Sequence, residues 1–173
     1  MAEELNRRIF RDISYGLYIL TSCAEGRSNG QIVNTVIQVT SEPARVAVIV
    51  NKQNFTHGLI DKSGAFAVSV LEQSVTLPFL GPFGFRSGRD IDKISKVQHQ
   101  EGITGCPIVT EHALSFLEAR VVSHLELGSH TIFVGETVRS QVLRDGIPLT
   151  YRYYHENLKG KSPSTAPTYQ PSR

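Results

Sequence analysis

Two polar segments of the chain carry residue types that can bind a phosphate group. The first, residues 51–58, reads NKQNFTHG and puts Lys52 just ahead of a predicted helix start, where free backbone N–H groups and the helix dipole favour an anion. The second, residues 85–93, reads FRSGRDIDK and offers a hydroxyl at Ser87 and a guanidinium fork at Arg89. Taken alone, each segment is more typical of a solvated charged loop beside a capped short helix.

A histidine and an aromatic cluster are further candidates. His130 follows the predicted turn of a hairpin, where a strand-end side chain can reach a pocket and position a cofactor, although a histidine in such a place is more often a turn residue. Tyr151, Tyr153, Tyr154 and His155 lie close together in the sequence. This cluster is equally typical of an aromatic patch that packs the last strand on the body of the fold or on a partner subunit.

Other chemistries have little support in the sequence. A Gly-x-Ser-x-Gly elbow, a Gly-x-Gly-x-x-Gly loop and a Walker loop are all missing. The two cysteines, Cys23 and Cys106, belong to no Cys-x-x-Cys pair and cannot supply the four thiolates of an iron or iron–sulfur site. A disulfide between them is geometrically possible, with two buried thiols as the default. The six histidines lack metal-ligand spacing, so we expect no metal site and an organic cofactor.

Composition narrows the class of protein. The 173 residues fit a single domain, and the hydrophobic fraction of 40% is ordinary for a globular fold. With 18 basic against 16 acidic residues the net charge is +2, which gives no footprint for nucleic acid. The longest apolar run, residues 46–50, is far short of the ~20 residues of a membrane helix, and the N-terminus lacks an apolar signal core. We therefore expect a soluble, cytoplasmic protein with no nucleic-acid or membrane partner.

The elements that position the candidate residues are mostly strands, because the hydrophobic pattern has period two. Strands are expected at residues 15–23, 30–41, 45–50, 66–71, 115–127 and 130–142, with Gly128-Ser129 as a type II′ turn between the last two. Short helices are expected at residues 3–12, near 56–62 before Gly64, and near 75–80. Many strands, few helices and no βαβ rhythm predict a mainly β fold, a Greek-key barrel.

The alternation also assigns faces to the two longest strands. In residues 30–41 one face is expected to hold Val33, Thr35, Ile37 and Val39; in residues 115–127 one face is expected to hold Leu117, Ala119, Val121, Leu125 and Leu127, with Glu118, Arg120, His124 and Glu126 on the other. From residue 160 the composition turns Pro/Ser/Thr-rich. We therefore divide the chain into a barrel domain, residues 1–159, and a tail, residues 160–173, that is either free or draped over the barrel.

In combination and in this order, the segments resemble the flavin reductase-like family of FMN-binding split β-barrels. The resemblance rests on NGQIVNT at residues 29–35 with TSEP at 40–43, NK at 51–52 with TH at 56–57, SGRD at 87–90 with Lys93, and GSHTIFVGE at 128–136. The chain is similar above all to flavoredoxins and to the flavin domain of high-molecular-weight rubredoxins. There the chain continues through a tail that resembles residues 160–169, GKSPSTAPTY.

The resemblance implies a homodimer with FMN in a groove near the subunit interface. Carried over by position, the residues that border the isoalloxazine, largely with main-chain atoms, are Gln31, Ile32, Val33, Asn34 and Thr35; those that meet the ribityl and phosphate are Asn51, Lys52, Thr56, Ser87, Arg89 and Lys93. His130 is expected near the flavin or the nicotinamide, and the Tyr154-His155 end with the tail is expected to cover the ring.

Three functions follow from this resemblance. The leading one is a flavin reductase that transfers hydride from NADH or NADPH to FMN and passes electrons on to an acceptor; the flavin carries the chemistry, so no catalytic side chain is needed. The alternative is a flavoredoxin-type electron carrier between protein partners with little NAD(P)H activity. The third is a non-redox FMN- or ligand-binding barrel, since fold is not function. Because two cysteines cannot build a rubredoxin, any iron centre is expected on a separate partner such as a rubredoxin.

Overall fold

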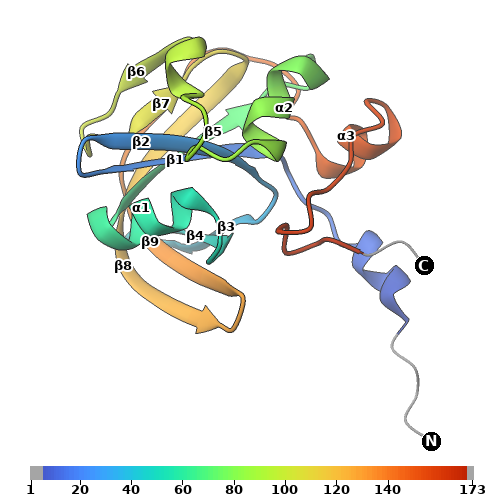
Figure 1. The fold of residues 1–173 in the computed structure, drawn as a ribbon, viewed down its shortest axis with the longest axis horizontal. Helices are drawn as coiled ribbons and strands as arrows, with labels where there is room; N and C mark the ends of the chain where they lie inside the picture. Colours follow the sequence, from blue (N-terminus) through green and yellow to red (C-terminus); the bar gives the residue numbers. More distant parts are fainter. Residues whose placement is uncertain (1–5, 171–173) are drawn as a thin grey trace, which may run out of the picture.

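The computed structural model describes residues 6–170 and consists of a strongly curved antiparallel sheet with short helices around it (Figure 1). Seven strands lie in the order β2-β1-β5-β8-β9-β4-β3, and β6 and β7 form a separate pair. Because β1 pairs with β5 and β4 with β9, the chain crosses between strands that are not consecutive. The predicted fold, a mainly β Greek-key split barrel with a few short helices, is confirmed. The strands are β1 Tyr18–Ala24, β2 Arg27–Val33, β3 Val36–Ser41, β4 Ala44–Asn51, β5 Ala65–Leu71, β6 His99–Glu101, β7 Pro107–Val109, β8 Ala113–Leu127 and β9 His130–Val142.

The long hairpin of β8 and β9 is the element that the sequence predicts best. Leu127 pairs with His130 across Gly128-Ser129, and Gly128 has a φ of 62°, as the first residue of a type II′ turn requires. The turn end of the hairpin projects below the body of the molecule in Figure 1. His130 at the start of β9 pairs with Asn51 at the end of β4, so both predicted site residues lie at one sheet position.

The predicted strand at residues 30–41 is in fact two strands. β2 pairs with β1 and β3 pairs with β4, and the chain changes partner at Asn34 and Thr35. Thr35 Oγ1 donates to the carbonyl of Ile49 across this break (3.3 Å). Past the break the predicted face no longer points inward: Ile37 is 55% exposed and Val39 is 46% exposed.

The face assignment in β8 holds as far as Val121, since Leu117, Ala119 and Val121 all contact the cluster that fills the barrel. It fails beyond Val121, because a register shift between Val121 and Ser123 interrupts the alternation. Glu118, predicted on the polar face, is fully buried and accepts hydrogen bonds from Thr104 N (3.0 Å) and Thr104 Oγ1 (2.7 Å). Leu125 and Leu127, predicted to share a face with buried Ala119, are exposed. A bulge moves every later side chain to the other face, and the apolar pattern alone does not locate it.

Within residues 6–170, five short helices accompany the strands: η1 Arg7–Arg11, α1 Phe55–Ser63, α2 Leu77–Phe85, η2 Ile94–Lys96 and α3 Tyr151–Glu156. α1 ends as predicted, at Gly64 in the left-handed conformation (φ 63°) with its N–H on the carbonyl of Ile60. α2 begins and ends later than the expected residues 75–80. Residues 3–5 of the helix expected at 3–12 lie outside the described residues. α3 was not predicted; the hydroxyl of Thr150 caps it by accepting from Tyr153 N (3.1 Å).

Two buried apolar clusters hold the barrel and its helices together. One fills the barrel and includes Leu20, Val48, Phe66 and Phe133. The other packs α2 and α3 on β1 and β5, and includes Leu17, Ile19, Leu71, Leu80, Phe83 and Tyr154. Burial of apolar surface contributes about 25 cal/mol of stabilising free energy per Å². These clusters are therefore the main source of stability. They fix α2 and α3 on one side of the sheet, where a pocket opens between them and β2.

The tail does not extend freely. Residues 160–170, which we call the strap, run back from α3 toward η1 along the same side of the barrel (Figure 1). Gly160 N donates to the carbonyl of Tyr154 (2.9 Å), and the Tyr154 hydroxyl donates to the carbonyl of Lys161 (2.9 Å). At its far end Arg11 Nε donates to Gln170 Oε1 (3.3 Å).

Candidate functional site

The candidate site is a pocket of about 380 Å³ that we call the site pocket. Its walls come from β2, the β4–α1 connection, α2 with the loop that follows it, α3 and the strap. Most of these walls are loops or lie near the ends of elements, and β2 is an edge strand of the sheet. The residues of these walls that the argument uses are Asn29, Gln31, Ile32, Val33, Asn34, Ile49, Asn51, Phe55, Leu80, Phe83, Ser87, Gly88, Arg89, Lys93, Tyr151 and Tyr154.

One end of the site pocket is apolar with a polar edge. Ile32, Leu80 and Phe83 supply apolar surface, and Asn34 comes from the β2–β3 break. Asn34 is only 5% exposed; its Nδ2 donates to Thr168 Oγ1 of the strap (2.6 Å), whereas its Oδ1 has no hydrogen-bond partner among the described residues. An unpaired buried acceptor is costly, so this oxygen is suited to accept from an N–H group of a ligand.

The other end of the site pocket is a polar loop that follows α2. Arg89 N donates to Ser87 Oγ (3.2 Å), and Arg89 Nη1 donates to the carbonyl of Gln53 (3.1 Å), which joins this loop to the β4–α1 connection. Gly88 lies directly on Asn29, because a Cβ at position 88 would be 2.1 Å from Asn29 Oδ1. Two segments far apart in the sequence therefore meet here, as the sequence predicts for a shared anion site.

Asn29 links this loop to the start of α1. It is 3% exposed, its Nδ2 donates to Thr56 Oγ1 (2.8 Å), and its Oδ1 has no hydrogen-bond partner among residues 6–170. Thr56 itself is fully buried and does not line the pocket. Asn29 was not among the predicted site residues; its place in the segment NGQIVNT was the signal that could have found it.

Lys93 brings a buried cation to the same end. It is 3% exposed, and its ammonium donates to the carbonyl of Arg86 (2.9 Å). Burial disfavours the charged form and lowers the pKa of Lys93 from 10.5 to about 8. An anion in the pocket would offset this desolvation, so the group is suited to bind one.

The strap and α3 cover the apolar end. The carbonyl of Thr165 accepts from His130 Nε2 (3.2 Å), and Thr168 Oγ1 donates to the Tyr151 hydroxyl (3.1 Å). The Tyr151 hydroxyl also hydrogen-bonds Ser162 Oγ. Burial raises the pKa of Tyr154, which keeps its hydroxyl a neutral donor to the strap. Of the two positions foreseen for the tail, free or draped over the barrel, the structure has the second.

The structure brings together nine of the predicted site residues around the site pocket: Gln31, Ile32, Val33, Asn34, Asn51, Ser87, Arg89, Lys93 and Tyr154. The other four, Thr35, Lys52, Thr56 and His130, do not line it. His130 reaches it through the strap and Thr56 through Asn29. The side chain of Thr35 instead joins the β2–β3 connection to β4 through the carbonyl of Ile49.

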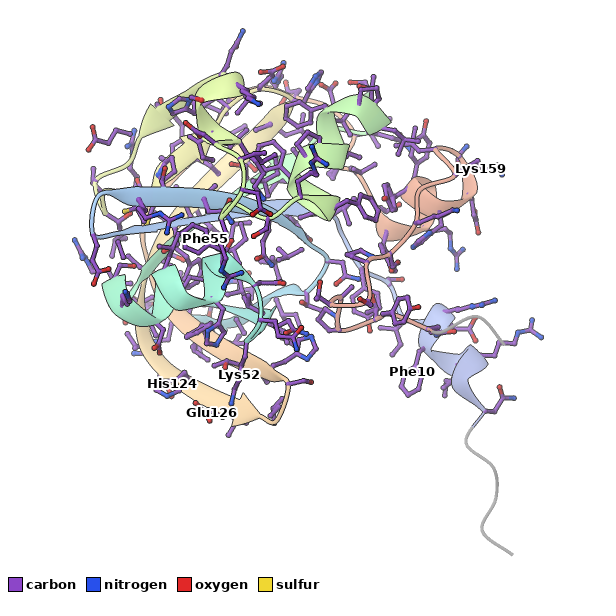
Figure 2. The ribbon with its side chains drawn as sticks, in the orientation of Figure 1. Phe10, Lys52, Phe55, His124, Glu126 and Lys159 are labelled. Carbon is purple, nitrogen blue, oxygen red and sulfur yellow. The ribbon has the colours of Figure 1, made fainter. Side chains whose placement is uncertain are left out.

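Lys52 points away from the site pocket to the β8–β9 hairpin. Its ammonium pairs with Glu126 (2.9 Å), next to His124 (Figure 2). This lysine is about one-third exposed and the carboxylate two-thirds exposed, so the pair is weak and can open. Contact between Lys52 and a phosphate stays a prediction of the sequence.

Cysteine and acidic side chains do not group into a metal site in the part of the chain that the structure describes. Cys23 and Cys106 are free thiols with 4.0 Å between their sulfur atoms. Burial and the neighbouring Cys106 raise the pKa of Cys23 to about 11. Within residues 6–170 no three His, Cys, Asp or Glu side chains lie where they could share a metal ion, and no helix has the length and apolarity to cross a membrane.

Comparison with known proteins gives one consistent answer. A family model described as flavin reductase like domain matches residues 10–160. A ferric-chelate reductase (NAD(P)H) from Archaeoglobus fulgidus is 50% identical over 164 residues, which are 95% of this chain and 97% of that protein. A high molecular weight rubredoxin from Moorella thermoacetica is 41% identical over 169 residues, 98% of this chain and 74% of that protein.

Solved structures agree with this result. A flavoredoxin from Methanosarcina acetivorans is 27% identical with a TM-score of 0.70, over 78% of this chain and 74% of that chain. A flavin reductase complexed with NADP+ is 25% identical with a TM-score of 0.72, over 84% of this chain and 90% of that chain.

Proposed function

The chain belongs to the family of flavin reductase like domains, and from this membership we propose that it is an NAD(P)H-dependent flavin oxidoreductase that binds FMN in the site pocket. The observation that carries the proposal is the 50% identity, over nearly the full length of both chains, to a ferric-chelate reductase that uses NAD(P)H. A ferric chelate is accordingly one candidate for the final electron acceptor, beside free flavin.

The site pocket fits FMN in size and polarity. Its volume is within the range of small-molecule sites. An isoalloxazine is flat and apolar on its faces and carries N–H and carbonyl groups along one edge, which suits the apolar end and the unpaired oxygen of Asn34. A phosphate dianion suits the polar end, where Arg89 and Lys93 supply positive charge and Ser87 a hydroxyl.

The predicted site residues that line the site pocket then have proposed roles. Residues 31–34 border the ring, Asn51 lies toward the ribityl chain, and Ser87, Arg89 and Lys93 hold the phosphate. Tyr154 fixes the strap over the ring through its bond to Lys161. His130 acts through the strap, since its ring nitrogen donates to the carbonyl of Thr165. Thr56 acts through Asn29.

When bound, FMN would supply the redox chemistry, as the acceptor of a hydride from NADH or NADPH. The chain's contribution is to bind and orient the flavin, to exclude water with the strap and α2, and to offer hydrogen-bond donors to an electron-rich ring. No side chain has to transfer a proton for this, so the sequence needs no acid–base pair.

An anaerobic titration tests the proposal. We expect the purified protein to be yellow, to release FMN rather than FAD on denaturation, and to bleach rapidly when NADH or NADPH is added. A colourless protein that does not respond to FMN would contradict the whole assignment.

A second candidate function is electron transfer between proteins, favoured by the similarity to a high molecular weight rubredoxin. Here the reduced flavin passes electrons to a separate small redox protein such as a rubredoxin. Stopped-flow mixing of the photoreduced protein with oxidised rubredoxin separates the two functions. Fast flavin reoxidation together with slow bleaching by both nicotinamides would favour the carrier over the reductase.

We also propose that the protein is a homodimer. The outward face of the sheet is apolar: Leu125 of β8 pairs with Ile132 of β9, which pairs with Ile49 of β4, whereas the neighbouring Val48, Val50 and Phe133 point into the barrel. Leu125 is 58% exposed and Leu127 is 49% exposed. Because Ile49 also lines the site pocket, a second copy on this face would lie beside the flavin. A cytoplasmic location stays a prediction of the sequence.

A further inference from the structure

A continuous series of side-chain hydrogen bonds connects the site pocket, the strap and α3. Asn34 Nδ2 donates to Thr168 Oγ1 (2.6 Å), which donates in turn to the Tyr151 hydroxyl (3.1 Å). The same hydroxyl is hydrogen-bonded to Ser162 Oγ. Ser162 Oγ lies 3.4 Å from Nε2 of His155, where the series ends. We call these five side chains the hydrogen-bond chain.

The two ends of the hydrogen-bond chain fix the direction of the bonds within it. At one end the amide nitrogen of Asn34 can only donate, so Thr168 Oγ1 accepts and gives its own proton to Tyr151. At the other end His155 Nδ1 lies 2.9 Å from the carbonyl oxygen of Gly160, which can only accept. Nδ1 therefore carries the proton of the neutral imidazole, and Nε2 is the acceptor.

All the hydrogen bonds then run toward His155. With Nε2 as an acceptor, Ser162 donates to the imidazole and Tyr151 donates to Ser162. A phenol oxygen can accept twice, and Thr168 occupies one of these positions, so Tyr151 can still accept a proton from a group in the site pocket. Hydroxyl groups that point the same way can pass a proton along, because each oxygen receives one proton and gives up its own.

The hydrogen-bond chain begins at the site pocket and ends near solvent. Tyr151 and Ser162 line the site pocket, whereas His155 does not. His155 is half-buried on α3, and α3 with the start of the strap lies at the outer edge of the molecule, where Lys159 is labelled (Figure 2). Histidine is the side-chain type that takes up and releases a proton near neutral pH.

The surroundings of His155 allow its ring to change charge. The ring contacts two tyrosines, with centroid distances of 4.3 Å to Tyr151 and 5.2 Å to Tyr154. Glu156, the next residue, pairs with Arg152 (4.0 Å), and the ion pairs found in residues 6–170 do not include His155. No carboxylate of these residues therefore holds the imidazolium, which can give its proton to water.

The proposed function leaves one proton in each cycle. A hydride consists of two electrons and one proton, whereas a ferric chelate accepts a single electron. When two ferric chelates oxidise one NADH or NADPH, the products are the oxidised nicotinamide, two ferrous chelates and one proton. Hydride transfer into the site pocket needs no proton from the protein, but departure of the two electrons leaves this proton behind. Because the strap and α2 cover the pocket, the proton needs a route to solvent.

We propose that Tyr151, Ser162 and His155 form a proton relay from the site pocket to solvent. The inference rests on the proposed function, which generates the proton. Tyr151 accepts this proton and passes its own to Ser162, which passes its own to Nε2 of His155. The imidazolium then releases one proton to water, and rotation of the hydroxyl groups restores the starting arrangement. Asn34 and Thr168 are positioning residues, because they fix the direction in which Tyr151 donates.

Nitrogen-15 NMR of the His155 imidazole tests the direction of the relay without any turnover. We expect the neutral ring to carry its proton on Nδ1 in flavin-free and in FMN-loaded protein, because the Gly160 carbonyl selects that tautomer. The spectrum of His155→Gln assigns the resonances. A proton on Nε2 would make the ring a donor to Ser162 and would overturn the proposal.

The two half-reactions separate a relay from a structural role. Photoreduced protein is mixed anaerobically with hexacyanoferrate(III), a one-electron acceptor, and oxidised protein is mixed with NADH or NADPH, each in H₂O and in D₂O. Tyr151→Phe and Ser162→Ala both interrupt the relay. We expect each to slow reoxidation about tenfold or more, with a larger solvent isotope effect, while reduction keeps its wild-type rate. Reoxidation at the wild-type rate in both variants overturns the proposal.

A small base in solution should replace the last member of the relay. His155→Ala should slow reoxidation as Ser162→Ala does, and added imidazole should restore its rate, because imidazole accepts the proton from Ser162 in place of the side chain. Imidazole should not restore Tyr151→Phe, in which the relay is interrupted at the pocket. If imidazole accelerates both variants equally, or neither, the proposal is overturned.

Two matched variants control for the loss of a hydroxyl from α3. The Tyr153 hydroxyl makes none of the hydrogen bonds found in residues 6–170 and does not line the site pocket, so Tyr153→Phe should leave both half-reactions unchanged. Tyr154→Phe removes the bond to Lys161 that holds the strap but leaves the relay intact. It should hasten FMN release without a selective loss of reoxidation. If Tyr154→Phe slows reoxidation as selectively as Tyr151→Phe, the hydrogen-bond chain only fastens the strap and the proposal is overturned.

The outcomes also separate this proposal from the proposed function. If neither NADH nor NADPH bleaches the protein, but Tyr151→Phe and Ser162→Ala slow reoxidation of the photoreduced protein, the relay stands and the reductase function fails. If both nucleotides reduce the wild type rapidly and the two variants are reoxidised at the wild-type rate, the reductase function stands and the relay fails.

Discussion

Lys93 places a buried ammonium beside the proposed phosphate position, and this makes flavin binding depend on pH. Its pKa is lowered to about 8 by burial. A bound phosphate dianion raises that pKa again, so binding takes up a proton at pH values above about 8. We therefore expect FMN affinity to be level between pH 7 and 8 and to fall as the pH rises further, measured by quenching of flavin fluorescence. Lys93→Gln should flatten the curve, and riboflavin, which has no phosphate, should show no such fall.

The same lysine affects stability in the flavin-free protein. Its pKa in the folded state lies below the unfolded value of 10.5, so the unfolded chain binds more protons between pH 8 and 10.5. The contribution of Lys93 to the free energy of unfolding should therefore rise across this interval and be least favourable below pH 8. Urea titrations of wild type and Lys93→Met at pH 7 and pH 10 check the sign. A difference between the two proteins that is the same at both pH values would contradict it.

Single substitutions of Arg89 and Lys52 are expected to differ in their effect on FMN binding. Arg89 lines the site pocket, and its loss should weaken FMN binding about tenfold or more while riboflavin binding stays nearly unchanged. Lys52 is held by Glu126 outside the pocket, so Lys52→Ala should have a smaller effect on FMN. If Lys52→Ala costs as much FMN affinity as Arg89→Ala, the exposed pair opens when flavin binds and the prediction from sequence holds for both.

At the residue scale the sequence predicts which residue types can bind a phosphate better than it predicts where their side chains point. Ser87, Arg89 and Lys93 follow from residue type alone, because hydroxyl and cationic groups beside a glycine are typical of phosphate loops. Lys52 and Thr56 have the same types, yet the turn after β4 directs Lys52 to the β8–β9 hairpin, and α1 buries Thr56 beneath Asn29. A strand end is visible in the sequence, but the side to which each following residue points depends on the turn.

At the scale of elements, the strap depends on the close approach of Gly160 to Tyr154. A Cβ at position 160 would lie 2.0 Å from Cζ of the tyrosine ring, so Gly160→Ala has to displace the ring or the strap. Such overpacking costs about 1–3 kcal/mol of unfolding free energy. Because both groups cover the site pocket, we expect faster FMN release as well, followed by flavin fluorescence after dilution.

Gly58→Ala is the control for this substitution. Gly58 lies within α1 with open space around it, so alanine there should stabilise the helix by about 0.5–1 kcal/mol and leave FMN release unchanged. If Gly160→Ala releases FMN at the wild-type rate, the strap does not retain the flavin.

The limits of prediction at this scale are the places where strands change partner or register. The hairpin at Gly128 and the end of α1 at Gly64 were predictable, because a left-handed glycine has a local cause. The break at residues 34–35 and the register shifts between β8 and β9 were not, because they follow from which strand lies alongside. α3 was missed since its four aromatic side chains resemble a packing patch, and only the cap by Thr150 marks a helix start.

At the scale of the whole molecule, the apolar outer face of β8, β9 and β4 predicts a dimer that stabilises the flavin site. Leu125 is at the exposed end of this face, and Ile49 joins the face to the site pocket. Burying exposed leucine and isoleucine side chains favours association by about 25 cal/mol per Å², while a charge within the interface would have to be desolvated. Leu125→Arg should therefore turn a dimer into a monomer, measured by light scattering after size exclusion, and should weaken FMN retention.

The matched control applies the same kind of substitution far from this face. Ile103 is 62% exposed in the loop between β6 and β7, at the other end of the barrel from the turn of the β8–β9 hairpin (Figure 1), so Ile103→Arg adds the same charge to an exposed apolar position. It should leave the dimer and the flavin content unchanged, because Ile103 belongs to neither the outer face nor the site pocket. A wild-type protein that is monomeric at micromolar concentration, or a Leu125→Arg protein that remains dimeric, would contradict the interface. Loss of FMN in a Leu125→Arg monomer that unfolds as cooperatively as wild type would mean that the second subunit contributes to the flavin site.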